Sequence, residues 1–390
     1  MLTRKVNFEQ GRTRSPLQVR LQSYPAVALV GPRQCGKTTL ASLLGGHYYD
    51  LEQQSERLRL DIEWEEVTKN NTLLILDEAQ TTPDIFPRLR AAIDNERTRN
   101  GRFLLLGSVS PSLMIQVSES LAGRLSVLEL TPLSWMELPE NAQRQRLWLC
   151  GGYPNGGVLD GRSFPLWQQD YLTLLIQRDL PAWGLPAKAQ VMRRLVRMLA
   201  ISHGMEWNAS QIGKSLGLSY HTVNSYVDYL EGAFLARRLP AFHANIRKRV
   251  IKRPKFYWRD SGLLHALLNV RHKRELLAQP WVGASWEGFV IEQILTAMQQ
   301  ADRPCEAWYL RTSDQQEIDL VLETASQLWA LEIKLTANPS RADMERLNVN
   351  ATLIGANRTF LVCRRSEFLT NGSQTVCDLD GMIAYIFKTR

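Results

Sequence analysis

The stretch from residue 31 to residue 39 combines glycines, a lysine and threonines in a spacing that can hold phosphate. It matches G-x-x-x-x-G-K-[ST], in which glycines let the backbone wrap a phosphate group and backbone amides point at the anion. Lys37 would reach the β- and γ-phosphates of a nucleotide, and the Thr38 hydroxyl would be a ligand of Mg²⁺. The residues of this predicted nucleotide-binding loop are Gly31, Pro32, Arg33, Gln34, Cys35, Gly36, Lys37, Thr38 and Thr39.

Two adjacent carboxylates, Asp77 and Glu78, close a later apolar run. Asp77 stands where a second Mg²⁺-coordinating group is needed, and Glu78 would polarise the attacking water. A protein that only holds a nucleotide needs the first acid alone, so the pair predicts hydrolysis. The alternative is a strand that ends in a solvated acidic turn. Either motif alone would favour that alternative, but the two motifs in this order argue against it.

A serine and an arginine further along the chain complete the predicted catalytic set. Ser108 follows a third apolar run, where a polar side chain can sense the γ-phosphate and hold the lytic water. Arg124 is a candidate arginine finger, donated to the γ-phosphate of a neighbouring subunit to neutralise transition-state charge. An ordinary surface arginine is the alternative for Arg124.

These side chains need a parallel sheet to bring them together. Apolar runs predict strands at 26–30, 72–76, 103–106 and 125–130, and a helix at 39–44. Continuous apolar runs are typical of strands buried on both faces of a parallel sheet, and alternating strands and helices indicate an α/β fold.

A second set of reactive side chains lies in the last third of the chain. Asp319 is followed thirteen residues later by Glu332, with Lys334 two positions beyond, on predicted adjoining strands. Period-2 alternation places Glu332 and Lys334 on one face beside Asp319. Asp319 and Glu332 would hold Mg²⁺, Lys334 would orient water, and Glu287 would add a further carboxylate, as in restriction-type nucleases. The alternative is a hairpin salt bridge in a domain that does not cleave.

A helix-turn-helix pattern precedes this region. Asn208 can cap a first helix, Gly217 can make the turn, and Ser219 can cap a second helix. An apolar stripe on the second helix would face inward, and strands at 234–239 and 255–258 would form a wing. The outward set is mostly uncharged, as a groove-reading helix can be: His221, Thr222, Asn224, Ser225 and Asp228.

The chain is basic, with a net charge of +8 and a pI near 9.3. Nine basic residues and no acidic one lie between residues 237 and 259, with aromatic residues interleaved. A polyanionic partner is therefore expected, with DNA first. The candidate DNA-binding residues are Arg247, Lys248, Arg249, Lys252, Arg253 and Lys255.

Composition also bounds the compartment. Five scattered cysteines without a C-x-x-C pair indicate a reducing cytoplasm and argue against zinc. No apolar run approaches the roughly 18 residues that a membrane span needs. A cytoplasmic protein without membrane contact is expected. Four segments are predicted: an α/β nucleotide-binding domain (1–138), a helical connector (139–203), a winged helix-turn-helix domain (204–275) and a restriction-nuclease-like α/β domain (276–390).

Together these motifs resemble a family of prokaryotic AAA-type ATPases that carry a C-terminal domain of unknown function. The resemblance implies an AAA-like P-loop ATPase domain, a winged helix and a nuclease-like PD-(D/E)XK module, with ATP and Mg²⁺ as cofactors. It also implies a homo-oligomer, such as a hexameric ring, which strengthens Arg124 as a finger. Where the family ends the strand before the sensor in Thr-Gly-Ser, this chain has Leu106-Gly107-Ser108, which leaves Ser108. Beyond the loop at 31–38, the resemblance to this family is carried by Leu76-Asp77-Glu78-Ala79-Gln80, Leu121-Ala122-Gly123-Arg124, Gly151-Gly152-Tyr153-Pro154, Tyr257-Trp258-Arg259-Asp260-Ser261-Gly262-Leu263, Glu317-Ile318-Asp319 and Glu332-Ile333-Lys334.

The main functional hypothesis is an ATP-hydrolysing AAA-type protein that binds and remodels duplex or branched DNA as an oligomer. Two alternatives stay open. One is a nucleotide-switched signalling or protein-interaction scaffold, favoured by the acid-bearing second helix. The other is an ATP-regulated, Mg²⁺-dependent DNA nuclease.

Overall fold

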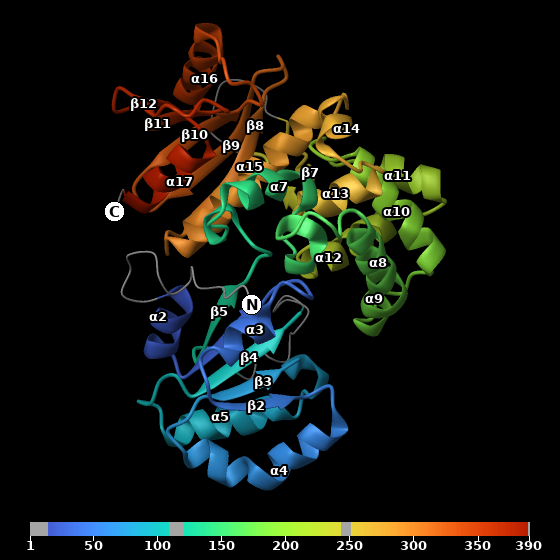
Figure 1. The fold of residues 1–390 in the computed structure, drawn as a ribbon, viewed down its shortest axis with the longest axis vertical. Coiled ribbons are helices and arrows are strands. Elements are labelled where there is room, and N and C mark those ends of the chain that lie inside the picture. Colours follow the sequence, from blue (N-terminus) through green and yellow to red (C-terminus); the bar gives the residue numbers. More distant parts are fainter. Residues whose placement is uncertain (1–14, 109–120, 243–250, 389–390) are drawn as a thin grey trace. The chain divides into compact units, whose positions relative to one another are not determined.

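The computed structural model describes residues 15–108, 121–242 and 251–388 (Figure 1). These residues divide into two compact units. The first runs up to Pro139 and also takes in Gly232–Phe234; the second comprises Glu140–Glu231 and the residues from Leu235 onward. Within the described ranges, no helix combines the length and apolar character needed to cross a lipid bilayer.

The first unit is built on a five-stranded sheet in the order β2-β3-β4-β1-β5. All four strand pairings are parallel. Its strands are β1 (Ala26–Val30), β2 (His47–Asp50), β3 (Leu74–Asp77), β4 (Phe103–Gly107) and β5 (Leu125–Glu129). The four predicted strands are confirmed, with ends shifted by one or two residues at β3, β4 and β5. The edge strand β2 escapes sequence reasoning because its four residues are no apolar run.

The described helices of this unit are α2 (Pro16–Ser23), α3 (Lys37–Ser42), α4 (Gln54–Lys69) and α5 (Ile85–Asn95), with two short 3₁₀ turns, η1 (Ala79–Thr81) and η2 (Trp135–Glu137). One face of the sheet packs against α2 and α3. The core on that face consists of Leu17, Val27, Leu29, Cys35, Leu40, Ala41, Ile75, Leu104, Leu106 and Leu130. Strand residues alternate between the two faces, and every residue of β1, β3 and β4 is buried, so the three central strands are covered on both faces.

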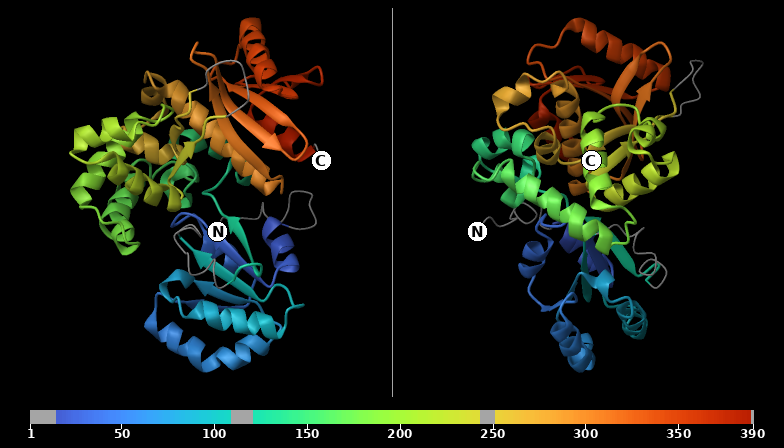
Figure 2. Two further views of the ribbon diagram at one scale, coloured as in Figure 1. Left: turned by 180° about the vertical axis from the view of Figure 1, so that it is seen from behind. Right: turned by 90° about the vertical axis from the view of Figure 1, so that its right-hand side faces the viewer.

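The second unit begins with helices and helical turns (Figure 2). In chain order these are α7 (Asn141–Cys150), η3 (Pro154–Val158), α8 (Leu166–Leu174), η4 (Leu175–Asp179), α9 (Leu180–Ala182) and α10 (Ala189–Ile201). The strongly amphipathic α10 buries Met192, Leu195, Val196 and Leu199 against its neighbours.

The predicted pair of helices follows as α11 (Ala209–Leu216) and α12 (Tyr220–Gly232). Both caps are confirmed: the Asn208 side chain accepts a hydrogen bond from the amide of Gln211, and the Ser219 hydroxyl accepts one from the amide of Thr222. Gly217 makes the turn with a left-handed φ of 69°. The inward stripe of α12 is buried as predicted; it consists of Val223, Tyr226, Val227 and Leu230.

An antiparallel pair of strands comes next, β6 (Ala236–Leu239) and β7 (Lys255–Trp258). The first begins two residues later than predicted, because Phe234 has a left-handed φ of 62° that a strand cannot accommodate. Two helices then lead into the C-terminal part, α13 (Ser261–Leu267) and α14 (Lys273–Leu277).

The C-terminal part contains a six-stranded sheet in the order β12-β13-β11-β10-β9-β8. Its first three strands in chain order, β8 (Cys305–Arg311), β9 (Glu317–Thr324) and β10 (Leu328–Ile333), are antiparallel neighbours, and the two predicted adjoining strands that carry Asp319 and Glu332 are thereby confirmed. A crossover helix leads to β11, which pairs with β10 in parallel. The other elements are α15 (Val282–Gln300), α16 (Arg341–Ile354), β11 (Arg358–Val362), β12 (Leu369–Thr370), β13 (Gln374–Cys377) and α17 (Leu379–Lys388).

Candidate nucleotide site

The loop after β1 has the backbone that its glycines require. The amide of Gly31 donates to the carbonyl of Gly107, and a Cβ at position 31 would lie only 2.1 Å from the carbonyl oxygen of Leu130. Gly36 has a left-handed φ of 99° directly before α3, whose first turn has no side-chain cap. Position 31 therefore needs glycine for space and position 36 needs it for conformation.

Lys37 is buried, with 6% of its surface exposed. Its Nζ donates to the carbonyls of Gly31 and Pro32, at 2.9 and 3.0 Å, and to Ser108 Oγ at 3.2 Å. A buried ammonium needs acceptors, and here the loop's own carbonyls and one hydroxyl supply them. The side chain is thus folded back across the loop that the sequence predicts to hold phosphate.

Asp77 lies at the end of β3 and receives three hydrogen bonds. Thr38 Oγ1 and the Tyr48 hydroxyl both donate to its Oδ2 at 2.7 Å. The amide of Glu78 donates to Oδ1 at 2.9 Å. The sequence predicts Thr38 and Asp77 as the metal-binding pair, and the structure places the two side chains in direct contact.

Glu78 is held on the other side of the same strand end. Its backbone is left-handed, with a φ of 49°. Ser108 Oγ donates to Oε1 at 2.7 Å, and the Gln80 amide group donates to Oε2. Four of the predicted side chains (Lys37, Asp77, Glu78 and Ser108) therefore meet at the carboxyl ends of β1, β3 and β4, where ligands bind in open α/β sheets.

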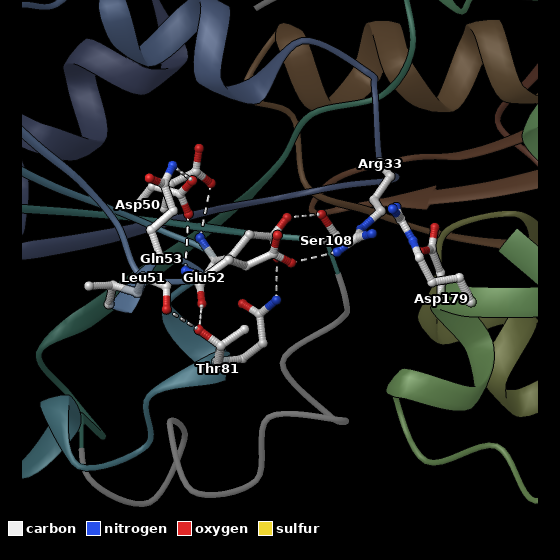
Figure 3. A network of polar contacts seen from close by, with 12 residues as sticks. Arg33, Asp50, Leu51, Glu52, Gln53, Thr81, Ser108 and Asp179 are labelled. Atoms are coloured by element: carbon white, nitrogen blue, oxygen red, sulfur yellow. Dashed lines mark hydrogen bonds and ion pairs between the residues drawn. The ribbon is translucent and has the colours of Figure 1, made fainter. Parts of the chain in front are cut away.

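The segment after β2 closes one side of this site (Figure 3). The Asp50 carboxylate accepts from the Glu52 amide and from the Gln53 side chain, at 3.0 and 2.8 Å. The Thr81 hydroxyl donates to the carbonyl of Leu51 at 3.0 Å. Glu52 also forms an ion pair of 2.7 Å with Arg33 of the loop. This network ties the segment after β2 to the loop and to η1.

Arg124 lies away from the loop of its own chain. It immediately precedes β5, whose first residue is in register with Ala26, the first residue of β1, whereas the loop follows the last residue of β1. A five-residue strand spans roughly 16 Å, so Arg124 lies at the amino ends of the strands and the loop at their carboxyl ends. Its guanidinium pairs with Asp94 at 2.8 Å and lowers the pKa of that carboxyl.

The residues present fit a nucleotide with Mg²⁺. The buried Lys37 ammonium can exchange loop carbonyls for phosphate oxygens, and the two glycines keep side chains out of the loop. Thr38 and Asp77 offer the hard oxygen donors that Mg²⁺ prefers. Cys35 is fully buried, its Sγ donating to the carbonyl of Leu130, and acts as a packing residue.

Sequence reasoning misses two residues of this site. Gln80 lies two positions beyond Glu78, so its nearness in the chain could have marked it. Tyr48 lies 29 residues before Asp77, and only the pairing of β2 with β3 brings the two together. No local pattern in the sequence signals that contact.

The second predicted set of reactive residues also gathers, in the C-terminal part. Asp319 on β9 accepts a hydrogen bond from the amide of Ile333, beside Glu332 on β10. Lys334 pairs with Glu332 at 2.6 Å. Burial, with Glu287 and Glu332 nearby, raises the pKa of Asp319 well above its usual value. Burial likewise raises the pKa of Glu332, against the opposing effect of Lys334.

A lysine from β7 enters this carboxylate cluster. Lys255 is 3% exposed, and its Nζ pairs with Glu287 at 2.9 Å and with Glu317. Burial lowers its pKa, but the surrounding acids outweigh that effect and raise it well above the usual value. In the described ranges, no group of three or more His, Cys, Asp and Glu side chains is arranged to hold a metal ion. Lysines therefore pair with two of the three carboxylates that the sequence predicts as Mg²⁺ ligands, Glu287 and Glu332.

Comparisons with known proteins agree with the first unit. A family model described as an AAA domain matches residues 23–139. The uncharacterised protein Rv2008c of Mycobacterium tuberculosis is 38% identical over 329 residues, which cover 83% of this chain and 73% of that protein. The uncharacterised protein Mb2031c of Mycobacterium bovis gives the same values. This chain belongs to their family.

The rest of the chain matches two further models. Both are described as domains of unknown function, DUF8612 over residues 141–274 and DUF4143 over residues 282–380. A solved structure, protein VC1899 from Vibrio cholerae, is similar over 93% of this chain and 96% of its own. Its sequence identity is 13% and its TM-score 0.21, a likeness too weak to indicate the fold. The match of residues 23–139 to the AAA domain model confirms the predicted AAA-type domain. The winged helix and the nuclease-like module stay predictions.

Two of the motifs that carry the sequence resemblance, at 151–154 and 257–263, form one buried contact. The Asp260 carboxylate accepts hydrogen bonds from the amides of Gly152 and Leu263, at 2.7 and 2.9 Å. Burial raises the pKa of Asp260 to about 6, although these amides oppose it. A Cβ on Gly262 would lie 1.9 Å from the carbonyl oxygen of Cys150. These motifs hold α7 and α13 together.

The basic tract requires a correction. Lys255 is predicted to contact DNA, but it is buried in the carboxylate cluster and presents no charge to solvent. Arg237 and Arg259 both pair with Glu292 of α15. Burial alone would raise the pKa of Glu292, but the two arginines outweigh it and lower the pKa. Of the other candidates, Lys252 and Arg253 are exposed, whereas Arg247, Lys248 and Arg249 lie outside the described residues.

The charge of Arg238 is likewise neutralised by acidic side chains. It pairs with Asp228 and Glu231 of α12. The physical reason for the correction is common to all these side chains. Acids that lie outside the tract in sequence but beside it in the fold neutralise four of its bases, Arg237, Arg238, Lys255 and Arg259, although the tract itself contains no acid.

Proposed function

We propose that this protein is a magnesium-dependent ATPase that binds ATP at residues 31–39 and hydrolyses the bond between its β- and γ-phosphates. The observation that carries the proposal is the shared hydrogen-bonding of the Ser108 hydroxyl, which joins Lys37 to Glu78 at one strand edge. Phosphate binding and activation of water then occur within one connected set of side chains. The match to an AAA domain supports the same reading.

Each side chain has a defined task in this proposal. Lys37 leaves the carbonyls of Gly31 and Pro32 and neutralises the β- and γ-phosphate oxygens. Glu78 accepts a hydrogen bond from the attacking water, and Ser108 and Gln80 fix the direction of its carboxylate. Mg²⁺, held near Thr38 and Asp77, supplies charge neutralisation between the phosphates.

The direct test is phosphate release from ATP by the full chain, with Mg²⁺ and with a chelator. Lys37→Ala should abolish ATP binding, because it removes the only buried cation that the structure places at the loop among the described residues. Arg57, whose guanidinium donates to the carbonyl of Leu51, is the control as Arg57→Lys. Unchanged ATP binding by Lys37→Ala would refute the proposed site.

We further propose that the ATPase acts as a homo-oligomer in which Arg124 serves the neighbouring subunit. Its position supports this proposal. Arg124 lies at the amino ends of the strands, whereas the loop of its own chain lies at their carboxyl ends, too far for the guanidinium to reach a phosphate bound there. Its pairing with Asp94 must open when it reaches a neighbour's γ-phosphate.

A second candidate function is nucleotide-controlled DNA binding. The helices α11 and α12 with the β6–β7 hairpin would then act as a winged helix, with His221 and Ser225 exposed on α12. Exposed Lys252 and Arg253 would supply phosphate contacts. Affinity for duplex or branched DNA should fall steeply with salt and fall again in the Lys252→Ala, Arg253→Ala double variant. Salt-independent binding, or none, would favour a protein-interaction scaffold.

The nuclease alternative rests on the carboxylate cluster. Mg²⁺-dependent DNA cleavage that disappears in both Asp319→Ala and Lys334→Ala would establish it. The three lysine–glutamate pairs in the cluster favour instead a domain that does not cleave.

A further inference from the structure

The phenol of Tyr48 reaches the predicted metal-binding carboxylate from the edge strand. Its hydroxyl donates to Asp77 Oδ2 at 2.7 Å, the same oxygen that accepts from Thr38 Oγ1. Tyr48 is in register with Ile75 on the neighbouring strand β3, and Asp50 is in register with Asp77. The strand pairing therefore fixes the phenol relative to the carboxylate.

Three donors fix the Asp77 carboxylate, and they are not equivalent. Thr38 Oγ1 is also a predicted ligand of Mg²⁺, so its oxygen must serve the metal as well as Asp77. The Glu78 amide holds only Oδ1. Tyr48 is the donor that remains on Oδ2 without any duty to the metal.

Resting on the proposed ATPase function, we propose that Tyr48 is a positioning residue that orients Asp77 for Mg²⁺. Groups that hydrogen-bond to a metal ligand fix its orientation, and their loss weakens metal binding by about 10–100-fold. Mg²⁺ demands nearly ideal octahedral geometry, so it is sensitive to a carboxylate that is free to rotate.

The adjacent Tyr49 provides a matched control. It lies on the same strand, fully buried where Tyr48 is partly buried, and its hydroxyl donates to Glu63 of α4, away from Asp77. Tyr48→Phe and Tyr49→Phe each remove one hydroxyl from the same strand. Only the first should change the response to metal.

The test measures ATP hydrolysis by the full chain against Mg²⁺ concentration, and binding of a fluorescent ATP analogue with Mg²⁺ and with a chelator. In Tyr48→Phe the half-saturating Mg²⁺ concentration should rise about 10-fold. Analogue binding in chelator should stay unchanged, and Mn²⁺ should restore most of the rate. Tyr49→Phe should match the wild type in all three.

Each other outcome counts against the inference. Wild-type half-saturation by Mg²⁺ in Tyr48→Phe, or an equal shift in Tyr49→Phe, would overturn the role of Tyr48 and leave the ATPase intact. Loss of analogue binding in chelator would show that Tyr48 supports the nucleotide loop and not the metal. If the wild-type chain neither binds nor hydrolyses ATP, the proposed function falls and this inference with it.

Discussion

The Ser108 hydroxyl donates a 2.7 Å hydrogen bond to Oε1 of Glu78. Ser108 Oγ in turn accepts a hydrogen bond from Lys37 Nζ at 3.2 Å. Because β4 lies between β1 and β3, the residue that follows it is placed to contact residues from both neighbouring loops. The predicted phosphate-binding cation and the predicted catalytic acid are thus joined through one side chain. If Lys37 binds phosphate as proposed, Ser108 would lose the hydrogen bond from Lys37 and keep the one that it donates to Glu78.

Replacing Glu78 by Gln keeps the shape of the side chain but removes its ability to accept a proton. ATP binding should survive, while kcat should fall by about 10²–10⁴-fold. Rapid-quench measurement of a single turnover, beside equilibrium binding of ATP, separates the two effects. Wild-type turnover by Glu78→Gln would mean that another group activates the water.

Replacing Ser108 by Ala tests the link itself. Loss of a hydrogen bond to a charged group costs about 1.5 kcal/mol, which corresponds to about a 10-fold lower kcat. Affinity for ATP should change less than kcat. The control is Ser126→Ala, because Ser126 is also buried in this sheet but accepts from Arg20 away from the site. Equal effects of the two substitutions would reduce Ser108 to a packing residue.

Arg124→Ala should lower kcat by about 10³-fold if the guanidinium acts on a neighbour's phosphate. Mixing this variant with Lys37→Ala should restore part of the activity, because some interfaces then combine an intact loop with an intact finger. Arg97→Ala is the matched control, since Arg97 also pairs with Asp94 but is largely exposed. A mixture as inactive as its components would exclude a shared site.

Lys255→Met should destabilise the second unit. Removing one partner of a buried ion pair costs about 3–5 kcal/mol, because it leaves carboxylates buried without a counter-charge. Lys252→Met, at an exposed position, should change the free energy of unfolding by less than about 0.5 kcal/mol. Chemical denaturation measures both. Similar stability of the two variants, with weaker DNA binding by Lys255→Met, would restore Lys255 as a nucleic-acid contact.

Much of the first unit could be predicted from sequence because its signals are local. The loop at 31–39, the strand before it and the helix after it are contiguous, and a few adjacent residues set their φ and ψ angles. The caps at Asn208 and Ser219 are local in the same sense, since each side chain bonds an amide three residues on. Asp77 and Glu78 could be predicted as site residues because they directly follow the apolar run at 72–76.

Other features depended on which distant segments lie side by side. Strand order decided that Tyr48 meets Asp77, that Ser108 lies between Lys37 and Glu78, and that Arg124 lies at the far edge of the sheet. Helix α15 and the strand β9 decided that Lys255 is buried among carboxylates and not exposed to a polyanion. Charge along a chain does not report its neutralisation across the fold, because ion pairs form between side chains adjacent in space. The sequence by itself determined the chemistry of the phosphate loop; the tertiary structure decided which partners each charged group keeps.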